Sequence, residues 1–315
     1  METPASATPA PAASPWRPTP LLRAVVALHV LAVIAVIVHP ALWPWALGTA
    51  LASHLPVVAA SLWPRSRWLG PNLTRLPETS AARGEIALTF DDGPDPDVTP
   101  AVLDLLDGHG MRATFFCIGE RAAAHPELCR DIVRRGHEVE NHSARHRHHF
   151  SLLGPRGYAR ELRAAQQTLS AITGVTPAFF RAPAGLRNPF LWPALTRHNL
   201  RLVSWTRRGY DTRSRDPARI LGRLLGNLRA GDILLLHDGH AARGASGRPV
   251  VLDVLPPLLA AIRAAGLKPV TLPAACSLSG VAERCTDGRP APLSEPPGGL
   301  PSPKETAPLC YKKNS

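Results

Sequence analysis

The chain has 315 residues, enough for one large α/β domain with additional segments or for two ordinary domains. Its 36 Lys and Arg against 24 Asp and Glu give a net charge of +12, but without interleaved aromatic residues or a zinc-finger or RNA-binding signature we expect no nucleic-acid binding. The five Cys are widely spaced without a CxxC pair, which argues against a disulfide framework and against a Cys-type zinc site, although Cys276 and Cys285 remain a possible pair.

Two apolar segments lie near the N-terminus, after a Pro- and Ala-rich stretch (residues 1–20) that we expect to be disordered. The segments, residues 24–43 and 45–63, contain no acidic residue, and each approaches the ~20 residues that cross a bilayer. Region 21–63 is therefore predicted to be a membrane anchor of two transmembrane helices. The alternative is a signal sequence followed by an amphipathic surface helix.

Basic residues around these segments predict their orientation. The turn between the segments has no Lys or Arg. Arg residues flank the pair on both sides, namely Arg17 and Arg23 before it and Arg65, Arg67 and Arg75 after it. Because Lys and Arg are enriched in cytoplasmic flanks, we expect a bacterial inner membrane location with the rest of the chain on the cytoplasmic face.

Short β-type runs alternate with longer helical patterns after a predicted linker (residues 64–83). We expect strands at residues 85–90, 113–118, 137–141, 178–182, 201–205, 232–237 and 268–272. Helical patterns lie between them, at residues 98–109, 126–135, 156–173, 189–199, 216–229 and 250–265. This alternation predicts an α/β domain over residues 84–272 with a parallel sheet, either doubly wound or closed into a barrel. Residues 273–315 are Pro-rich and are expected to be a mostly disordered tail.

Polar side chains follow five of the predicted strands at the point where each strand ends. They lie at residues 91–92, 142–146, 181–185, 205–211 and 237–238. The carboxyl ends of parallel strands meet at one rim, where α/β folds gather their active sites. The shared position predicts one active site at that rim.

Asp91 and Asp92 stand side by side where the first strand ends and a Gly93-Pro94 turn begins. Past the strand's end, such a turn can direct both carboxylates toward the same rim. Two carboxylates held close raise one another's pKa, and both ionise at low cost only beside a cation. The pair therefore predicts a metal ion, the alternative being an Asp pair that caps the following helix.

His142 and His146 supply further ligand candidates. They are four residues apart, which on a helical turn places both imidazoles on one face. With one aspartate they form a two-His, one-carboxylate set, which leaves coordination positions open for water and substrate, as a catalytic zinc site requires. The alternative is a His-rich solvated loop, because His148 and His149 follow closely.

Five motifs of the sequence, in the order in which they occur, resemble those of the polysaccharide deacetylases, the NodB-homology carbohydrate esterases of family 4. They are TFDDG (89–93), HSARH (142–146), RAPAG (181–185), WTRRGYD (205–211) and LLLH (234–237). The resemblance implies a distorted (β/α)7-8 barrel and a hydrolase that removes N- or O-acetyl groups from glycans with the help of zinc or another divalent metal.

The resemblance also implies roles for single residues. Asp91 would be the catalytic base, oriented by Arg181. His237 would be the general acid, held and charged by Asp211. The implied metal ligands are Asp92, His142 and His146, most simply for Zn²⁺. The implied substrate-binding residues are Pro183, Ala184, Gly185, Trp205 and Leu235.

Three positions depart from the family's pattern. Ala184 stands where a bulky aromatic residue is usual, Arg208 replaces an acidic residue, and Thr212 replaces a common Trp. These changes leave the metal and proton-transfer groups in place but alter the walls of the sugar site. A basic cluster lies beside that rim and consists of Arg207, Arg208, Arg213 and Arg215. It predicts an anionic group near the sugar, the alternative being a set of arginines on a solvated loop.

We therefore expect a membrane-anchored, metal-dependent hydrolase that removes an acetyl or formyl group from an amino sugar in a polysaccharide or lipid-linked glycan. Protein partners cannot be inferred from the residues. A glycan-binding protein without turnover is the alternative. A non-haem iron oxygenase uses the same ligand set, but those sites usually lie on antiparallel jelly rolls rather than on βα units.

Overall fold

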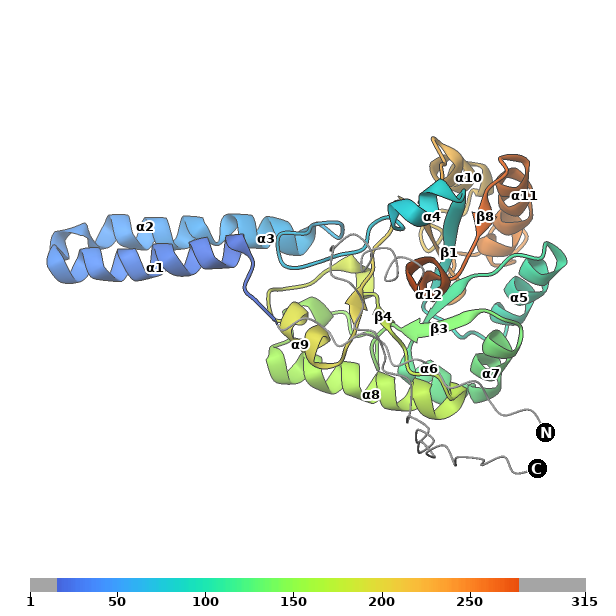
Figure 1. Cartoon of the computed structure of the whole chain (residues 1–315), viewed down its shortest axis with the longest axis horizontal. Coiled ribbons are helices and arrows are strands. Elements are labelled where there is room, and N and C mark those ends of the chain that lie inside the picture. The colour runs from blue at the N-terminus through green and yellow to red at the C-terminus, as the bar shows by residue number, and fades with distance from the viewer. Residues whose placement is uncertain (1–15, 278–315) are drawn as a thin grey trace, which may run out of the picture.

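The computed structural model describes residues 16–277. The described residues exclude most of the N-terminal and C-terminal segments predicted to be disordered. They also exclude Cys285, the possible partner of Cys276. The described chain forms a long helical hairpin attached to a domain in which helices surround a curled sheet (Figure 1).

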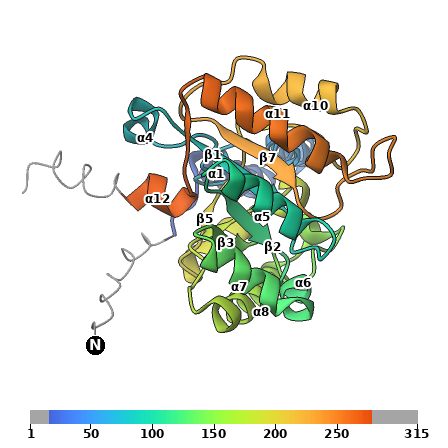
Figure 2. The ribbon, with the colours of Figure 1, turned by 90° about the vertical axis from the view of Figure 1, so that its right-hand side faces the viewer.

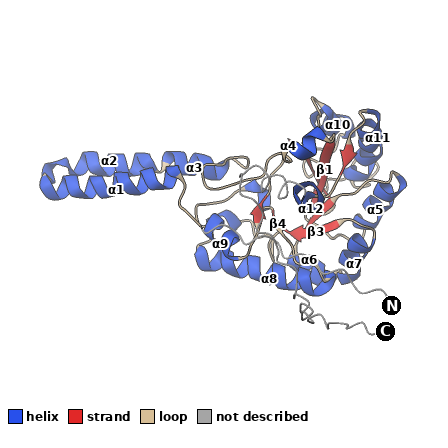
Figure 3. Cartoon of the chain, in the orientation of Figure 1, coloured by secondary structure: helices blue, strands red, loops and turns tan. Residues whose placement is uncertain are grey.

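Within residues 16–277, eight parallel strands build the sheet, in the order β5-β4-β3-β2-β1-β7-β6, with β8 paired to the start of β1. Figure 3 shows the strands in red among the helices of the domain. Seven of them lie within or one residue beyond the predicted strands, which confirms the parallel α/β architecture, and β6 is additional. The strands are β1 (Glu85–Asp91), β2 (Thr114–Cys117), β3 (Glu138–Asn141), β4 (Phe179–Phe180), β5 (Arg201–Leu202), β6 (Arg207–Arg208), β7 (Ile233–His237) and β8 (Lys268–Pro269).

Helices connect the strands and cover the outer face of the sheet (Figure 2). All six predicted helices of the domain are present, and three short ones, α4, α6 and α12, are additional. The domain's helices are α4 (Glu78–Ala82), α5 (Thr99–Gly108), α6 (Gly119–Ala124), α7 (Pro126–Arg134), α8 (Pro155–Thr173), α9 (Leu191–Arg197), α10 (Pro217–Leu225), α11 (Val250–Ala264) and α12 (Leu272–Ser277), with 3₁₀ turns η2 (Phe150–Leu152) and η3 (Pro183–Gly185).

The two faces of β1 have different roles. Ile86, Leu88 and Phe90 point outward into the core that packs beneath α5, α7 and α11. The alternate residues point inward, because successive side chains of a strand face opposite sides. On this inner face Glu85, paired with Arg83, begins the strand, and the buried Ala87, Thr89 and Asp91 follow it. Beyond Glu85, the inner face of β1 therefore rises from an apolar base to the carboxylate at the rim.

Strand β7 repeats this arrangement beside β1. The two strands pair in parallel register, so that Asp91 lies opposite His237. Ile233 belongs to the inner apolar base, whereas Leu235 and His237 line the cavity above it. The register thus places an acidic and a basic side chain next to each other at the rim.

The N-terminal hairpin contains α1 (Pro20–Val38), η1 (Pro40–Leu42), α2 (Trp43–Ser53) and α3 (Leu55–Leu62). Helix α1 and the α2–α3 pair lie side by side and project away from the domain (Figure 1). Two stretches, Pro20–Val38 and Pro40–Leu62, are long and apolar enough to cross a membrane, and none of the α1 residues is buried.

Residues 64–83, predicted as a linker, lie against the domain. Leu69 and Leu76 are buried, and Leu73 forms a parallel bridge with Val203. Directly after α3, the Pro64 carbonyl accepts hydrogen bonds from Asn72 Nδ2 (2.9 Å) and Ser204 Oγ (2.7 Å). These contacts attach the base of the hairpin to the end of the sheet that carries the polar motifs.

Candidate active site

The turn after β1 brings both aspartates to one side. Asp91 is the last residue of the strand, and Asp92 has a left-handed backbone (φ +72°). This conformation interrupts the strand's alternation, which would otherwise point the two side chains to opposite faces. Both carboxylates are buried at the rim of the cavity, as the sequence predicted.

His142 and His146 lie in an irregular loop after β3, not on the predicted helical turn. Ser143 and His146 have positive φ values (68° and 48°) that a helix does not accommodate. The loop is held by two local hydrogen bonds, from Ser143 N to Asn141 Oδ1 (2.9 Å) and from His146 N to Ser143 Oγ (3.0 Å). Short polar side chains that bond to nearby backbone favour such turns over helix. The imidazoles nevertheless converge, with ring centroids 5.0 Å apart.

Asp92, His142 and His146 form a cluster that suits a divalent metal. Asp92 Oδ1 lies 3.2 Å from His142 Nε2 and 3.1 Å from His146 Nε2. Among the described residues, this buried oxygen has no hydrogen-bond partner. One ligand atom from each residue lies within 4.8 Å of the others. A carboxylate and two imidazoles are the donor set of catalytic zinc sites, so these residues fit the group.

Hydrogen bonding and nearby charges set the orientation and the pKa of the two imidazoles in this cluster. His142 Nδ1 donates to the Arg181 carbonyl at 2.9 Å, which leaves the lone pair of Nε2 facing the cluster. Burial lowers the pKa of His142, but the two aspartates outweigh it and raise that pKa above its ordinary value. The cluster thus attracts positive charge. Burial and the adjacent His142 lower the pKa of His146 to about 4, so this imidazole is neutral at neutral pH.

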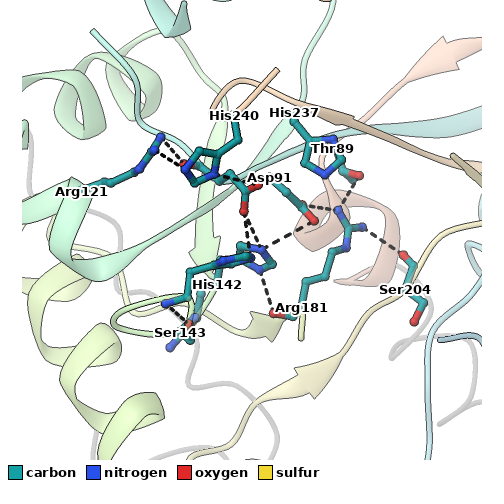
Figure 4. A network of polar contacts seen from close by, with 12 residues as sticks. Thr89, Asp91, Arg121, His142, Ser143, Arg181, Ser204, His237 and His240 are labelled. Atoms are coloured by element: carbon teal, nitrogen blue, oxygen red, sulfur yellow. Dashed lines mark hydrogen bonds and ion pairs between the residues drawn. The ribbon is translucent and has the colours of Figure 1, made fainter. Parts of the chain in front are cut away.

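Arg181 fixes the orientation of Asp91. Its Nη1 donates to Asp91 Oδ1 at 2.6 Å and to Thr89 Oγ1 at 2.8 Å, and its Nη2 donates to the Ser204 carbonyl at 3.0 Å (Figure 4). The guanidinium also lies 4.1 Å from the centre of the Phe116 ring. With Oδ1 held by Arg181, Asp91 Oδ2 faces the Asp92–His142–His146 cluster and lies 3.9 Å from His142 Nε2.

His237 and Asp211 form a buried pair beside Asp91, because His237 is the register partner of Asp91 on the neighbouring strand. His237 Nδ1 lies 2.9 Å from Asp211 Oδ1, and the His237 backbone N–H donates to Asp211 Oδ2 at 2.8 Å. Burial lowers the pKa of His237, but Asp211 outweighs this effect, so the pKa is raised above its ordinary value. Because Nδ1 is used by Asp211, Nε2 is the ring nitrogen available to the cavity.

A cavity of about 360 Å³ joins these groups. It brings together all the predicted metal, base and acid residues and four of the five predicted substrate-binding residues, since Pro183 is not part of its lining. Residues that the motifs did not assign also line it, and the lining in full is Asp91, Asp92, His142, His146, His148, Ala184, Gly185, Trp205, Arg208, Thr212, Arg213, Leu235, His237 and His240. Arg207 and Arg215, predicted with the basic cluster at this rim, do not contribute to the lining.

His240 is the part of the site that the sequence did not reveal. Its Nδ1 lies 3.3 Å from Asp92 Oδ2, and its Nε2 lies 2.7 Å from Arg121 Nη2. Arg121 also donates to the Asp92 carbonyl at 2.9 Å. Figure 4 shows Arg121 directed toward His240. His240 therefore contacts the carboxylate oxygen of Asp92 that the two imidazoles do not approach, and Arg121 holds the backbone of Asp92. The only signal for His240 was its place three residues after His237.

Comparison with known proteins agrees with this geometry. The family profile "Polysaccharide deacetylase" matches residues 79–203, which include both aspartates, both histidines and Arg181 but end before Asp211 and His237. A Bacillus cereus peptidoglycan-N-acetylglucosamine deacetylase is 32% identical over 195 residues, covering 61% of this chain and 68% of that protein. A chitooligosaccharide deacetylase of Bradyrhizobium sp. is 34% identical over 194 residues, covering 60% of this chain and 89% of that protein.

Solved structures extend the agreement to the fold. A family 4 carbohydrate esterase from Streptomyces lividans, in complex with acetate, is 32% identical with a TM-score of 0.53, covering 59% of this chain and 91% of that one. The curled parallel sheet and the distorted barrel implied by the motifs are therefore confirmed. By its motifs, its fold and these relatives, the chain belongs to the polysaccharide deacetylase family, the carbohydrate esterases of family 4.

Proposed function

We propose that this chain is a metal-dependent hydrolase that removes an N-acyl group, acetyl or formyl, from an amino sugar. The observation that carries the proposal is the Asp92–His142–His146 cluster, with Asp91 Oδ2 beside it and His237 on the neighbouring strand at the rim of the same cavity. The relatives' activities on N-acetylglucosamine glycans support this substrate class.

Asp91 is proposed as the general base. Arg181 holds Asp91 Oδ1 and leaves Oδ2 beside the metal cluster, where it can accept a proton from a water molecule that attacks the acyl carbon. A divalent metal bound by Asp92, His142 and His146 would supply a water of lowered pKa and polarise the acyl oxygen. The backbone N–H near Ala184 is proposed as a donor to the developing oxyanion.

His237 is proposed as the general acid. Its raised pKa keeps the imidazole protonated at neutral pH more fully than an ordinary histidine. Asp211 fixes Nδ1 and thereby directs the Nε2 proton into the cavity, where it can protonate the departing amine. Asp91 and His237 are register partners on the neighbouring strands β1 and β7, so the base and the acid lie side by side at the rim of the cavity. This arrangement suits a reaction that takes a proton from water and gives one to the leaving group.

The substrate is proposed to be a polysaccharide or a lipid-linked glycan near a membrane surface. The hairpin exposes large apolar side chains, with Ile37 74% and Leu55 69% accessible, which water does not favour. Helix α1 has 19 residues and is therefore about 28 Å long at ~1.5 Å per residue, close to the ~30 Å of a bilayer core. The flanking Arg residues favour the cytoplasmic face for the domain.

The metal-binding residues provide the test. We expect Asp92→Ala and His142→Ala to lose bound metal, measured by elemental analysis of the purified full chain, together with release of acetate or formate from acylated amino sugars. His149→Ala is the matched control, because His149 is exposed and does not line the cavity. Full activity of Asp92→Ala after metal removal would refute the proposal, and glycan binding without hydrolysis by the unaltered chain would favour the binding-protein alternative.

A further inference from the structure

Arg207 and Arg208 are neighbours in β6 but have opposite environments. Arg207 Nε lies 2.6 Å from Asp232 Oδ2, and its other nitrogens donate to the carbonyls of Gly226 and Asn227. Arg208 lies on the other side of the strand, where it lines the catalytic cavity. The charge of Arg207 is thus compensated within the domain, and it has a structural role.

The charge of Arg208 has no such compensation. Within residues 16–277 its side chain makes no ion pair or hydrogen bond, and its Nε atom is buried without a partner. The acidic groups of the cavity are already engaged, Asp91 by Arg181 and Asp92 by the histidines. Burying a guanidinium without a hydrogen-bond acceptor costs desolvation free energy, and a bound ligand that supplies an acceptor would offset that cost.

Aromatic rings hold this guanidinium in place. Its central carbon lies 5.2 Å from the centre of the Trp205 ring and 4.9 Å from that of the Tyr210 ring. Such contacts use the faces of the planar group and leave its N–H edges free for planar acceptors. Arg213, exposed and without an ion-pair partner in the described part of the chain, lines the same cavity.

We propose that Arg208, assisted by Arg213, forms a subsite for an anionic oxygen group, a phosphate or a carboxylate, carried by the acylated amino-sugar substrate. The proposal rests on the proposed function, since it assigns a further substrate feature to the same cavity. Arginine binds both groups through paired N–H···O bonds, and such charged hydrogen bonds are among the strong ones. The subsite would select charged glycans over neutral ones.

The position of the subsite favours the phosphate. A Cβ atom on Gly185 would lie 2.6 Å from both Pro64 Cβ and Trp205 Cη2, so the base of the hairpin is packed next to Trp205. Trp205 is the ring on which Arg208 lies. The subsite is therefore adjacent to the point where the apolar hairpin joins the domain, and a lipid-linked sugar presents its phosphate at that level.

The test compares three substrates with the same N-acetylglucosamine ring and octyl chain: a neutral glycoside, a 1-phosphodiester and a glycoside with a 3-O-lactyl carboxylate. The full-length protein, Arg208→Gln and Arg215→Gln are assayed at one ionic strength. Arg215 is the matched control, since it is an exposed arginine of the same loop that does not line the cavity. We expect kcat/KM for an anionic substrate to exceed that for the neutral one by about tenfold or more.

In Arg208→Gln the ratio of kcat/KM for the anionic substrate to kcat/KM for the neutral one should fall toward one, mainly because KM for the anionic substrate rises. In Arg215→Gln the ratio should remain as in the parent protein. A preference for the phosphodiester identifies a phosphate ligand, and a preference for the lactyl compound identifies a carboxylate ligand. No preference in the parent protein, or a ratio unchanged by Arg208→Gln, would overturn the subsite.

Failure of the proposed function has a different signature. If the parent protein hydrolyses none of the three compounds, binding of N-acetylglucosamine 1-phosphate is measured calorimetrically instead. Weaker binding to Arg208→Gln than to Arg215→Gln would then support the subsite, and equal binding would overturn it.

Discussion

Asp211 controls the protonation of His237, and the pH dependence of activity should show it. Because Asp211 raises the pKa of His237, the imidazole stays protonated to higher pH than an ordinary histidine. In Asp211→Asn the pKa of His237 should fall, so that the His237 imidazole loses its proton at a lower pH. The alkaline limb of the kcat/KM profile should move to lower pH, and activity above that limb should fall by roughly a hundredfold.

Asp97→Asn is the control for this experiment, because Asp97 is an exposed carboxylate outside the cavity. An alkaline limb that stays in place in Asp211→Asn would show that His237 does not act as the acid. Loss of activity without any change in the profile would point to a purely structural role for Asp211.

Single residues show how far the sequence predicted the site. The two carboxylates, the histidine pair and His237 line one cavity, because parallel strands bring their carboxyl ends together. Arg181 and Asp211 lie behind that lining, bonded to Asp91 and His237. The reason given for the histidine spacing was wrong, since positive φ values and local side-chain bonds decide that loop. His240 was missed because its relation to Asp92 depends on two loops that are far apart in the chain.

At the level of elements, the turn after β1 leaves no room for an added side chain at Gly93. A Cβ atom on Gly93 would lie 2.1 Å from Oδ2 of Asp238, whose carboxylate is fully buried and bonded to Thr99 Oγ1 at 2.6 Å. Gly93→Ala must therefore displace either the buried Asp238 side chain or the turn that carries both aspartates. We expect a loss of about 1–3 kcal/mol in unfolding free energy, together with weakened metal binding.

Gly108→Ala is the matched control, because Gly108 ends helix α5 and a Cβ atom there would meet nothing within 4 Å. Alanine is favoured over glycine in a helix, so this variant should be as stable as the parent or more stable. Both are measured by denaturant unfolding in detergent, with metal content determined in parallel. Equal stability of the two variants would contradict the packing argument.

The sequence predicted long elements better than short ones. Strands and helices with a clear period were found, whereas β6 consists of two arginines and has no apolar pattern to reveal it. Its position depends on pairing with β7 and on the Arg207–Asp232 ion pair, which are contacts between distant segments. The segment before α4 lacked a helical period for the same reason, since Leu73 and Leu76 are held by contacts with the sheet rather than by a helix of their own.

At the scale of the whole molecule, the hairpin and the catalytic cavity form one connected unit. Arg187 is buried at their junction, where its Nη1 donates to the Pro64 carbonyl at 3.1 Å and its Nη2 to the Ser66 carbonyl. Gly185, two residues earlier, lies against Pro64 and also lines the cavity. A hairpin that spans a bilayer would therefore hold the cavity at a fixed height above the membrane surface.

The distribution of tryptophans agrees with a spanning hairpin. Trp43 and Trp45 are exposed at the far end of the hairpin, and Trp63 and Trp68 are exposed where it joins the domain (Figure 1). Tryptophan collects at the two membrane–water interfaces, and these two groups are separated by the length of the helices. The Arg residues lie only at the end near the domain, which predicts that both ends of the hairpin are cytoplasmic and that its tip is outside.

Reporter fusions test this orientation on the intact chain. Alkaline phosphatase, which is active only outside the cytoplasm, should be inactive when fused after residue 315 and active when inserted at the tip after residue 41. β-Galactosidase at the same two positions should give the reverse pattern and serves as the control for expression. Because the helices would cross the bilayer as a pair, phosphatase activity at the C-terminus would place the catalytic cavity outside the cell and overturn the cytoplasmic assignment. Phosphatase inactivity at both positions, with the chain still in the membrane fraction, would instead show that the hairpin lies on the membrane without crossing it.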